Sequence, residues 1–182
     1  MLRTSRLELT YELPQLLDHL EEKFYRNIET WSKSAARRIK DLDDDNSPQW
    51  VLHYIVDTQK LLLEISGFLR LRRSTLAPYV QELVEKKTDG HDCRNCSTSC
   101  TIRHASHAYE VKSAQLKVRE ALSQLQSILV PAKKETLNMT CFIALRREIG
   151  TLEILLAELF YLEEFTLLPR LIEVQTNIHA HS

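Results

Sequence analysis

Apolar residues recur at spacings of three and four along four long stretches of this chain, and this pattern constrains its fold more than any other feature. Such spacing places the apolar side chains along one face of an α-helix. Residues that end helices separate the stretches: Asp43 to Pro48, Thr88 to Gly90, and Pro131. We therefore expect four helices, followed by a frayed tail over residues 170–182. The expected helices span residues 13–42, 48–87, 101–130 and 132–167.

Each expected helix has an apolar stripe that would pack into a common core. Four amphipathic helices with mostly short connections are typical of an antiparallel up-and-down four-helix bundle. Pro78 predicts a kink or break in the second helix, and Pro169 predicts the end or a kink of the fourth. The expected fold is therefore all-α, a single domain over residues 1–182, with a Cys/His-rich loop between helices two and three. The expected core residues are Leu17, Leu20, Phe24, Ile28, Trp31, Ala35, Ile39, Leu42, Val51, Ile55, Leu62, Ile65, Leu69, Leu76, Val80, Leu83, Val111, Val118, Leu122, Leu125, Leu129, Leu145, Ile149, Leu152, Leu156 and Leu159.

The composition agrees with a helical fold and limits the classes of function. Three glycines and five prolines in 182 residues are few for a β fold with many turns. The net charge is −1 and the basic pairs are scattered, so we expect no nucleic-acid partner. The longest apolar runs are a few residues, far short of a signal peptide or of the roughly 20 residues that span a bilayer. We expect a soluble, cytoplasmic protein that does not bind membranes.

Three of the four cysteines lie in one polar segment, HDCRNCSTSC, at residues 91–100. In a reducing compartment, clustered cysteines bind metal or carry out redox chemistry more often than they form structural disulfides. With the helix that follows, the segment gives the pattern Cys-x2-Cys-x3-Cys-x3-His. The last two of these residues would share a helix face, so that all four could surround Zn²⁺ tetrahedrally. The predicted zinc ligands are Cys93, Cys96, Cys100 and His104, with His91, His107 and Glu163 less favoured.

The same cysteines permit other interpretations. They could ligate an iron–sulfur cluster or form a thiol redox switch, and their clustering could also be incidental. An iron–sulfur cluster usually has four thiolate ligands, so the fourth position would here be left to His104 or to an external ligand. We expect Cys141 to be a small buried side chain. An antiparallel bundle would place it about 30 Å from Cys100, too far to take part in the site.

Two histidines extend the apolar stripe of the third helix towards its start. Counting back from Val111 by fours and threes gives His107 and then His104, so both are expected to face inward at one end of the bundle. With the helix boundaries given above, His104 would be level with residues 158–163 of the fourth helix. Glu163 could then orient His104 or bind the metal itself; alternatively, it begins the solvated end of its helix.

The stretch LEEFTLLPRL, residues 162–171, resembles the Glu-Glu…Leu-Phe-Pro segment of hemerythrin-like four-helix bundles. Members of that family bind two iron atoms and sense or carry small oxygen species. Their histidine one helical turn before the glutamate is replaced here by Leu159 and Phe160, and the first two helices have no equivalent inward-facing histidine pairs. The resemblance therefore implies a shared bundle architecture and no iron site.

These features favour a non-enzymatic, zinc-binding helical module that interacts with a protein partner or with a second copy of itself. The ion would cross-link the loop and fix the start of the third helix. A redox or iron–sulfur sensor is the main alternative. A metalloenzyme with an open position near His104, His107 and Glu163 is a weaker one. The chain has no Gly-rich phosphate loop, nucleophile elbow or His-Glu-x-x-His motif, so no enzyme class gains support.

Overall fold

The computed structural model describes the backbone of residues 11–42, 48–88, 99–129 and 140–180, and their side chains except those of 99–105, 108, 129 and 178–180. These residues form four long helical segments. The first consists of α1 (Leu13–Leu20), the π-helical turn η1 (Glu21–Tyr25) and α2 (Arg26–Leu42). The second consists of α3 (Gln49–Leu71), the π-helical turn η2 (Arg72–Leu76) and α4 (Ala77–Thr88). The third is α5 (Ser99–Leu129), and the fourth consists of α6 (Thr140–Leu162), the π-helical turn η5 (Glu163–Leu167) and α7 (Leu168–Ala180).

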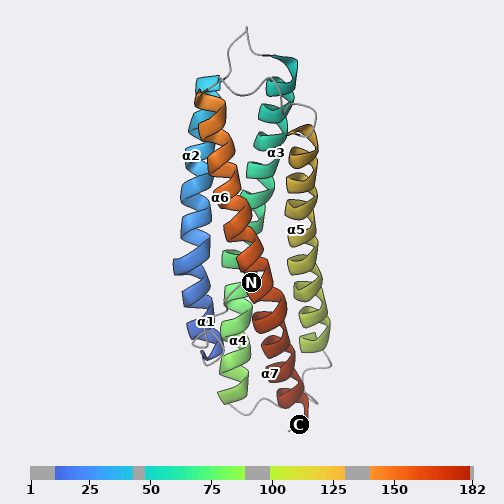
Figure 1. Ribbon diagram of the computed structural model, residues 1–182. Helices are drawn as coiled ribbons and strands as arrows, with labels where there is room; N and C mark the ends of the chain where they lie inside the picture. Colours follow the sequence, from blue (N-terminus) through green and yellow to red (C-terminus); the bar gives the residue numbers. More distant parts are fainter. Residues whose placement is uncertain (1–10, 43–47, 89–98, 130–139, 181–182) are drawn as a thin grey trace.

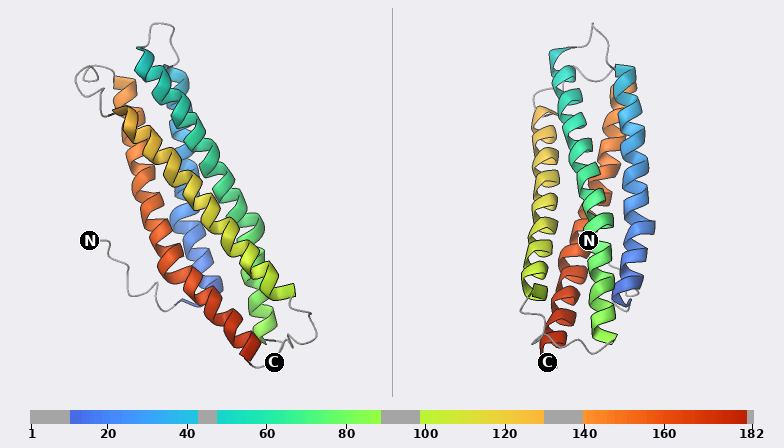
Figure 2. Two further views of the ribbon diagram at one scale, coloured as in Figure 1. Left: turned by 90° about the vertical axis from the view of Figure 1, so that its right-hand side faces the viewer. Right: turned by 180° about the vertical axis from the view of Figure 1, so that it is seen from behind.

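The four segments pack antiparallel, which confirms the expected all-α four-helix bundle (Figure 1). The most extensive backbone contacts between the segments join α3 to α5 and α2 to α6. Figure 2 shows the same elongated arrangement from the side and from behind. The predicted Cys/His-rich loop between the second and third segments lies outside the described residues.

The predicted apolar stripes form the core of the bundle. Nearly all of the predicted core residues that the structure describes are buried, while Leu17, Leu62 and Leu122 are partly buried at its edge. The prediction is wrong for Trp31, which is 37% exposed. Trp31 stands at the margin of its stripe, where a large ring reaches solvent. None of the described helices is both long enough and apolar enough to cross a membrane.

Two prolines lie inside the long segments without ending them. A proline ring in a regular α-helix collides with the carbonyl of the residue four positions earlier, and it cannot donate a backbone hydrogen bond. For Pro78 and Pro169 these earlier residues are Ser74 and Phe165, which lie within η2 and η5. A π-helical turn has a wider hydrogen-bonding pattern, so it accommodates the proline that follows. The second segment therefore does not break at Pro78, and the fourth does not end at residue 167. Of the predicted alternatives, a break and an end are wrong, and no described feature tests the predicted kinks.

The fourth segment extends beyond its predicted end. Its described part begins at Thr140, and the predicted start at residue 132 lies outside the described residues. It continues as α7 to Ala180, where the sequence predicted a frayed tail. The continuation is held by burial, since Leu171 and Gln175 are buried and α7 packs against α4. A 13-residue helix with a buried face thus replaces the expected tail.

We expect Leu171→Ala to lower the free energy of unfolding by about 2–5 kcal/mol, because it removes most of a buried apolar side chain. The neighbouring Ile172 is 55% exposed, so Ile172→Ala should change that free energy by no more than about 0.5 kcal/mol. Urea denaturation of the two variants measures both values. Equal effects would mean that α7 is not packed onto the core.

Candidate functional site

The predicted zinc ligands are only partly within the described residues. His91, Cys93 and Cys96 lie outside them, and the side chains of Cys100 and His104 are also not described. The backbone of α5 begins at Ser99, so Cys100 and His104 lie in its first two turns, one turn apart. Within the described part of the chain, no group of three or more His, Cys, Asp and Glu side chains is placed to hold a metal ion. The four-ligand zinc site therefore stays a prediction.

Cys141 is exposed, and the prediction that it is buried is wrong. It stands in the first turn of α6, where Phe142 and Leu145 provide the buried positions. Figure 1 shows that α6 begins at the upper end of the bundle, whereas α5 begins at the lower end. Cys141 is therefore far from Cys100, as the sequence predicted.

Glu163 lies deep inside the bundle, so the interpretation that it begins a solvated helix end is wrong. Gln115 donates a hydrogen bond to it at 2.5 Å, which makes Glu163 level with Gln115 of α5. His104 lies eleven residues earlier in α5, about 16 Å along the helix axis. The expectation that His104 is level with Glu163 is therefore wrong. Glu163 therefore has partners other than His104.

The main partner of Glu163 is Arg72, with which it forms an ion pair. Both side chains are fully buried. Arg72 Nε donates to Glu163 Oε1 at 3.0 Å, and Arg72 Nη2 donates to Glu163 Oε2 at 2.8 Å. Tyr25 donates its hydroxyl hydrogen to Oε1 at 3.2 Å, and Gln115 Nε2 donates to Oε2. Each of the four helical segments supplies one residue to this buried centre, which we define as Tyr25, Arg72, Gln115 and Glu163.

The guanidinium group of Arg72 has further partners inside the bundle. Its Nη2 also donates to the backbone oxygen of Val111 at 3.3 Å, and its central carbon lies 3.8 Å from the centroid of the Phe68 ring. Its Nη1 has no hydrogen-bond partner among the described residues. Part of the cost of burying this charge is therefore not compensated by hydrogen bonds.

Three members of the buried centre lie in π-helical turns. Tyr25 ends η1, Arg72 begins η2 and Glu163 begins η5. Such turns rotate the side chains that follow them relative to a regular α-helix, and they are frequent at functional sites. Burial and then the negative charge of Glu163 raise the pKa of Tyr25 well above its usual value. The tyrosine therefore stays protonated and keeps donating to the carboxylate at neutral pH. The four side chains of the buried centre are buried, and their hydrogen bonds link the four helical segments.

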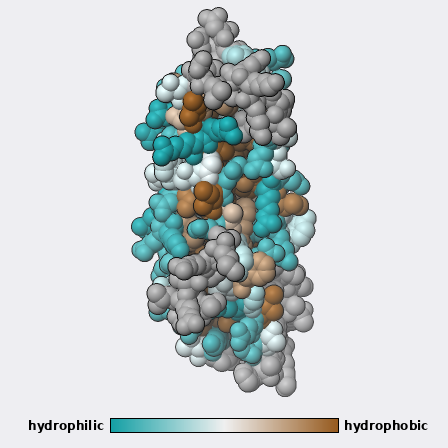
Figure 3. Space-filling view, in the orientation of Figure 1, coloured by the Kyte–Doolittle hydropathy of each residue, from teal (hydrophilic) through white to brown (hydrophobic). Residues whose placement is uncertain are grey.

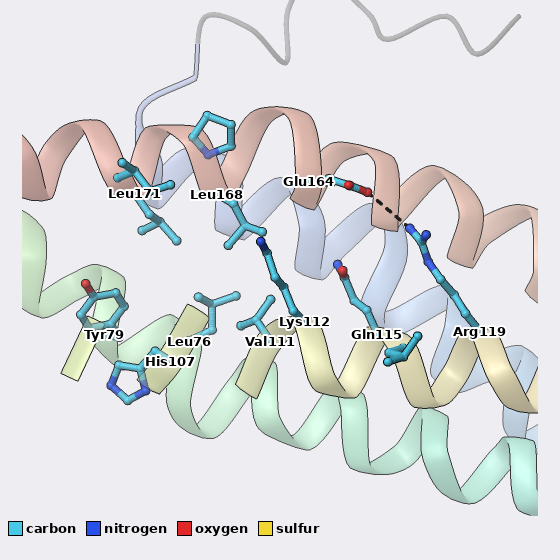
Figure 4. Close-up of a pocket in the computed structure, with 13 residues that line it drawn as sticks. Leu76, Tyr79, His107, Val111, Lys112, Gln115, Arg119, Glu164, Leu168 and Leu171 are labelled. Carbon is cyan, nitrogen blue, oxygen red and sulfur yellow. Dashed lines mark hydrogen bonds and ion pairs between the residues drawn. The ribbon is translucent and has the colours of Figure 1, made fainter. Parts of the chain in front are cut away.

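A hollow of about 480 Å³ lies beside the buried centre, between α4, α5 and α7. Gln115 belongs to both, because it lines the hollow and donates to Glu163. Figure 4 shows Lys112 extending from α5 across the hollow towards α7, and Arg119 paired with Glu164 at one end. The lining residues are Leu76, Tyr79, His107, Val111, Lys112, Gln115, Leu116, Arg119, Glu164, Leu168, Pro169, Leu171 and Ile172.

A second hollow of about 290 Å³ adjoins the first and lies between α5 and α6. Arg119 and Glu164 line both hollows. Its lining residues are Arg119, Leu122, Glu153, Leu156, Ala157, Phe160, Tyr161, Glu164 and Phe165. We call the two hollows together the α5–α7 groove. Figure 3 shows hydrophobic surface patches interrupted by hydrophilic residues on the face of the bundle that faces the viewer in Figure 1.

His107 lies at the end of this groove and not in a metal-binding group of described residues. It is half-buried, and its ring centroid is 4.7 Å from that of Tyr79. Its Nδ1 lies 3.9 Å from a carboxylate oxygen of Glu110, which is too long for a hydrogen bond. The prediction that His107 faces inward is thus confirmed in part, because its side chain is half-buried. It contacts Tyr79 and forms part of the wall of the groove.

The sequence itself contains a signal for the buried centre. Arg72 stands three residues after Leu69 and four before Leu76, in the middle of an apolar stripe. Gln115 stands in the same way between Val111 and Val118. A charged or amide side chain at a core position requires a buried partner. Such positions could have predicted that the helices share a polar contact, although not which residues meet.

Comparisons with protein-family models, with curated proteins and with solved structures found no match to this chain.

We expect Glu163→Gln to lower the free energy of unfolding by about 3–5 kcal/mol, because it leaves the charge of Arg72 buried without a counter-charge. The matched control is Glu164→Gln, at the adjacent position. Glu164 is half-exposed and pairs with Arg119 at 3.4 Å, so its loss should cost about 0–1 kcal/mol. Chemical denaturation monitored by circular dichroism gives both values. The assignment of Glu163 to a buried ion pair would be contradicted by a loss as small as that of the control.

Proposed function

We propose that this chain is a non-enzymatic interaction or regulatory module, a helical bundle that binds Zn²⁺ through its Cys/His segment and a protein partner through its surface. The proposed zinc ligands are Cys93, Cys96, Cys100 and His104. The observation that carries the interaction role is the α5–α7 groove, which is open to solvent and lined mainly by apolar side chains. Apolar hollows of this kind are typical of sites that bind a partner or a ligand.

The course of α5 supports a link between the metal and the groove. Cys100 and His104 belong to the first two turns of α5, and residues of α5 from His107 to Leu122 line one wall of the groove. A zinc ion that cross-links the preceding segment to Cys100 and His104 would hold the start of this wall in place. Removal of the ion, or oxidation of the thiolates, would release it. This coupling is the basis of the proposed regulatory role.

The metal part of the proposal is tested by metal analysis of protein purified without oxygen. We expect about one Zn²⁺ per chain in the wild type, and a loss of bound zinc in Cys96→Ser because a tetrahedral site then lacks one thiolate. The matched control is Cys141→Ser, since Cys141 is exposed at the other end of the bundle and should leave the zinc content unchanged.

Two results would contradict this part of the proposal. A wild-type protein that binds no metal would exclude the zinc site, and zinc that persists in Cys96→Ser would exclude the proposed ligand set. A brown protein that absorbs near ~400 nm would favour the alternative iron–sulfur sensor over zinc.

A further inference from the structure

We propose that the α5–α7 groove binds one amphipathic α-helix of a partner protein, with an acidic residue of that helix against Lys112. This inference rests on the proposed interaction role and does not depend on zinc. It is carried by three properties of the groove: its unfilled apolar surface, its length between two helical walls, and the distribution of its charges.

The groove exists because the backbone of α5 packs much more extensively against α3 than against the fourth segment. Side chains bridge the remaining gap, namely Gln115 to Glu163, and Arg119 to Glu164. Apolar side chains line this gap and remain exposed: Leu116 at 56%, Phe165 at 61% and Ile172 at 55%. Large apolar side chains gathered around a hollow are typical of a contact surface.

The dimensions of the groove fit a helix of about four turns. Its wall on α5 extends from His107 to Leu122, which corresponds to about 22 Å at the rise of an α-helix. Both walls are helices, so a further helix can pack its side chains between their ridges in the way that helices of a bundle do. Along the fourth segment, the residues that line the two hollows are centred about nine positions apart. Two apolar anchors separated by about 14 Å on the partner helix would therefore fill them.

The charges of the groove select the partner and its direction. Lys112 extends into the first hollow and has no ion-pair or hydrogen-bond partner among the described residues, whereas Arg119 is already paired with Glu164 (Figure 4). Glu153 lines the second hollow and accepts a hydrogen bond from the uncharged Gln126. A partner helix with a carboxylate near Lys112, and none near Glu153, complements both ends. Opposite charges at the two ends would also disfavour the reversed orientation.

The experiment uses phage-displayed 16-residue peptides selected on the full chain. Apolar residues are fixed at helical positions i, i+4, i+7 and i+11, and the other positions are randomised. We expect the selected peptides to carry acidic residues at one end. A fluorescein-labelled selected peptide should bind Lys112→Glu at least tenfold more weakly than wild type. The matched control, Lys117→Glu, changes an exposed lysine of α5 that does not line the groove, and it should alter the affinity less than twofold.

A second peptide, in which lysine replaces the acidic residues, should bind Lys112→Glu better than it binds wild type. The inference is overturned if no selected peptide depends on Lys112, if Lys117→Glu has the same effect, or if the selected peptides lack acidic residues. It is also overturned if light scattering shows a dimer that Lys112→Glu dissociates, because the occupant is then a second copy. Unchanged peptide binding by Cys96→Ser that has lost its metal would refute only the proposed coupling between the zinc ion and the groove.

Discussion

The buried ion pair between Arg72 and Glu163 is the interaction on which the arrangement of the four helices depends. Moving two charges out of water costs several kcal/mol each, and this cost is offset only when the charges meet with good geometry and further hydrogen bonds. Here the carboxylate receives two hydrogen bonds from Arg72 and one each from Tyr25 and Gln115. A shift of any helix by one turn would leave a buried charge or amide without its partner. We infer that the buried centre sets the register of the bundle, which apolar contacts alone would define less strictly.

The same centre also shapes the surface proposed to bind a partner. Gln115 must reach from α5 to Glu163, and this contact holds α5 beside the fourth segment while its backbone packs against α3. The side-chain bridge leaves room for the two hollows on the outer side. The π-helical turns contribute in a different way, because they let the second and fourth segments continue through their prolines. Without η5, Leu168 and Leu171 of α7 would not form the far wall of the groove.

The sequence predicted the helices and most of the core because a helical period in the apolar residues depends only on local spacing. The prediction failed where the structure depends on a contact between residues that are far apart in the chain. The continuation of the fourth helix past Pro169 depends on a π-helical turn, and the burial of Glu163 depends on an arginine 91 residues away in the chain. The groove could not be predicted either, since it follows from how far apart α5 and α7 lie. The zinc ligands remain predictions from the spacing of Cys and His.

We propose that a metal at the start of α5 stabilises one wall of the α5–α7 groove. Hydrogen–deuterium exchange of the purified chain can be compared with Zn²⁺ bound and after its removal by a chelator. We expect zinc to slow the exchange of backbone amides in residues 99–115 and to leave the exchange of α2 unchanged, because α2 lies on the opposite side of the bundle from α5. Identical exchange of residues 99–115 in the two states would show that the metal does not stabilise this wall.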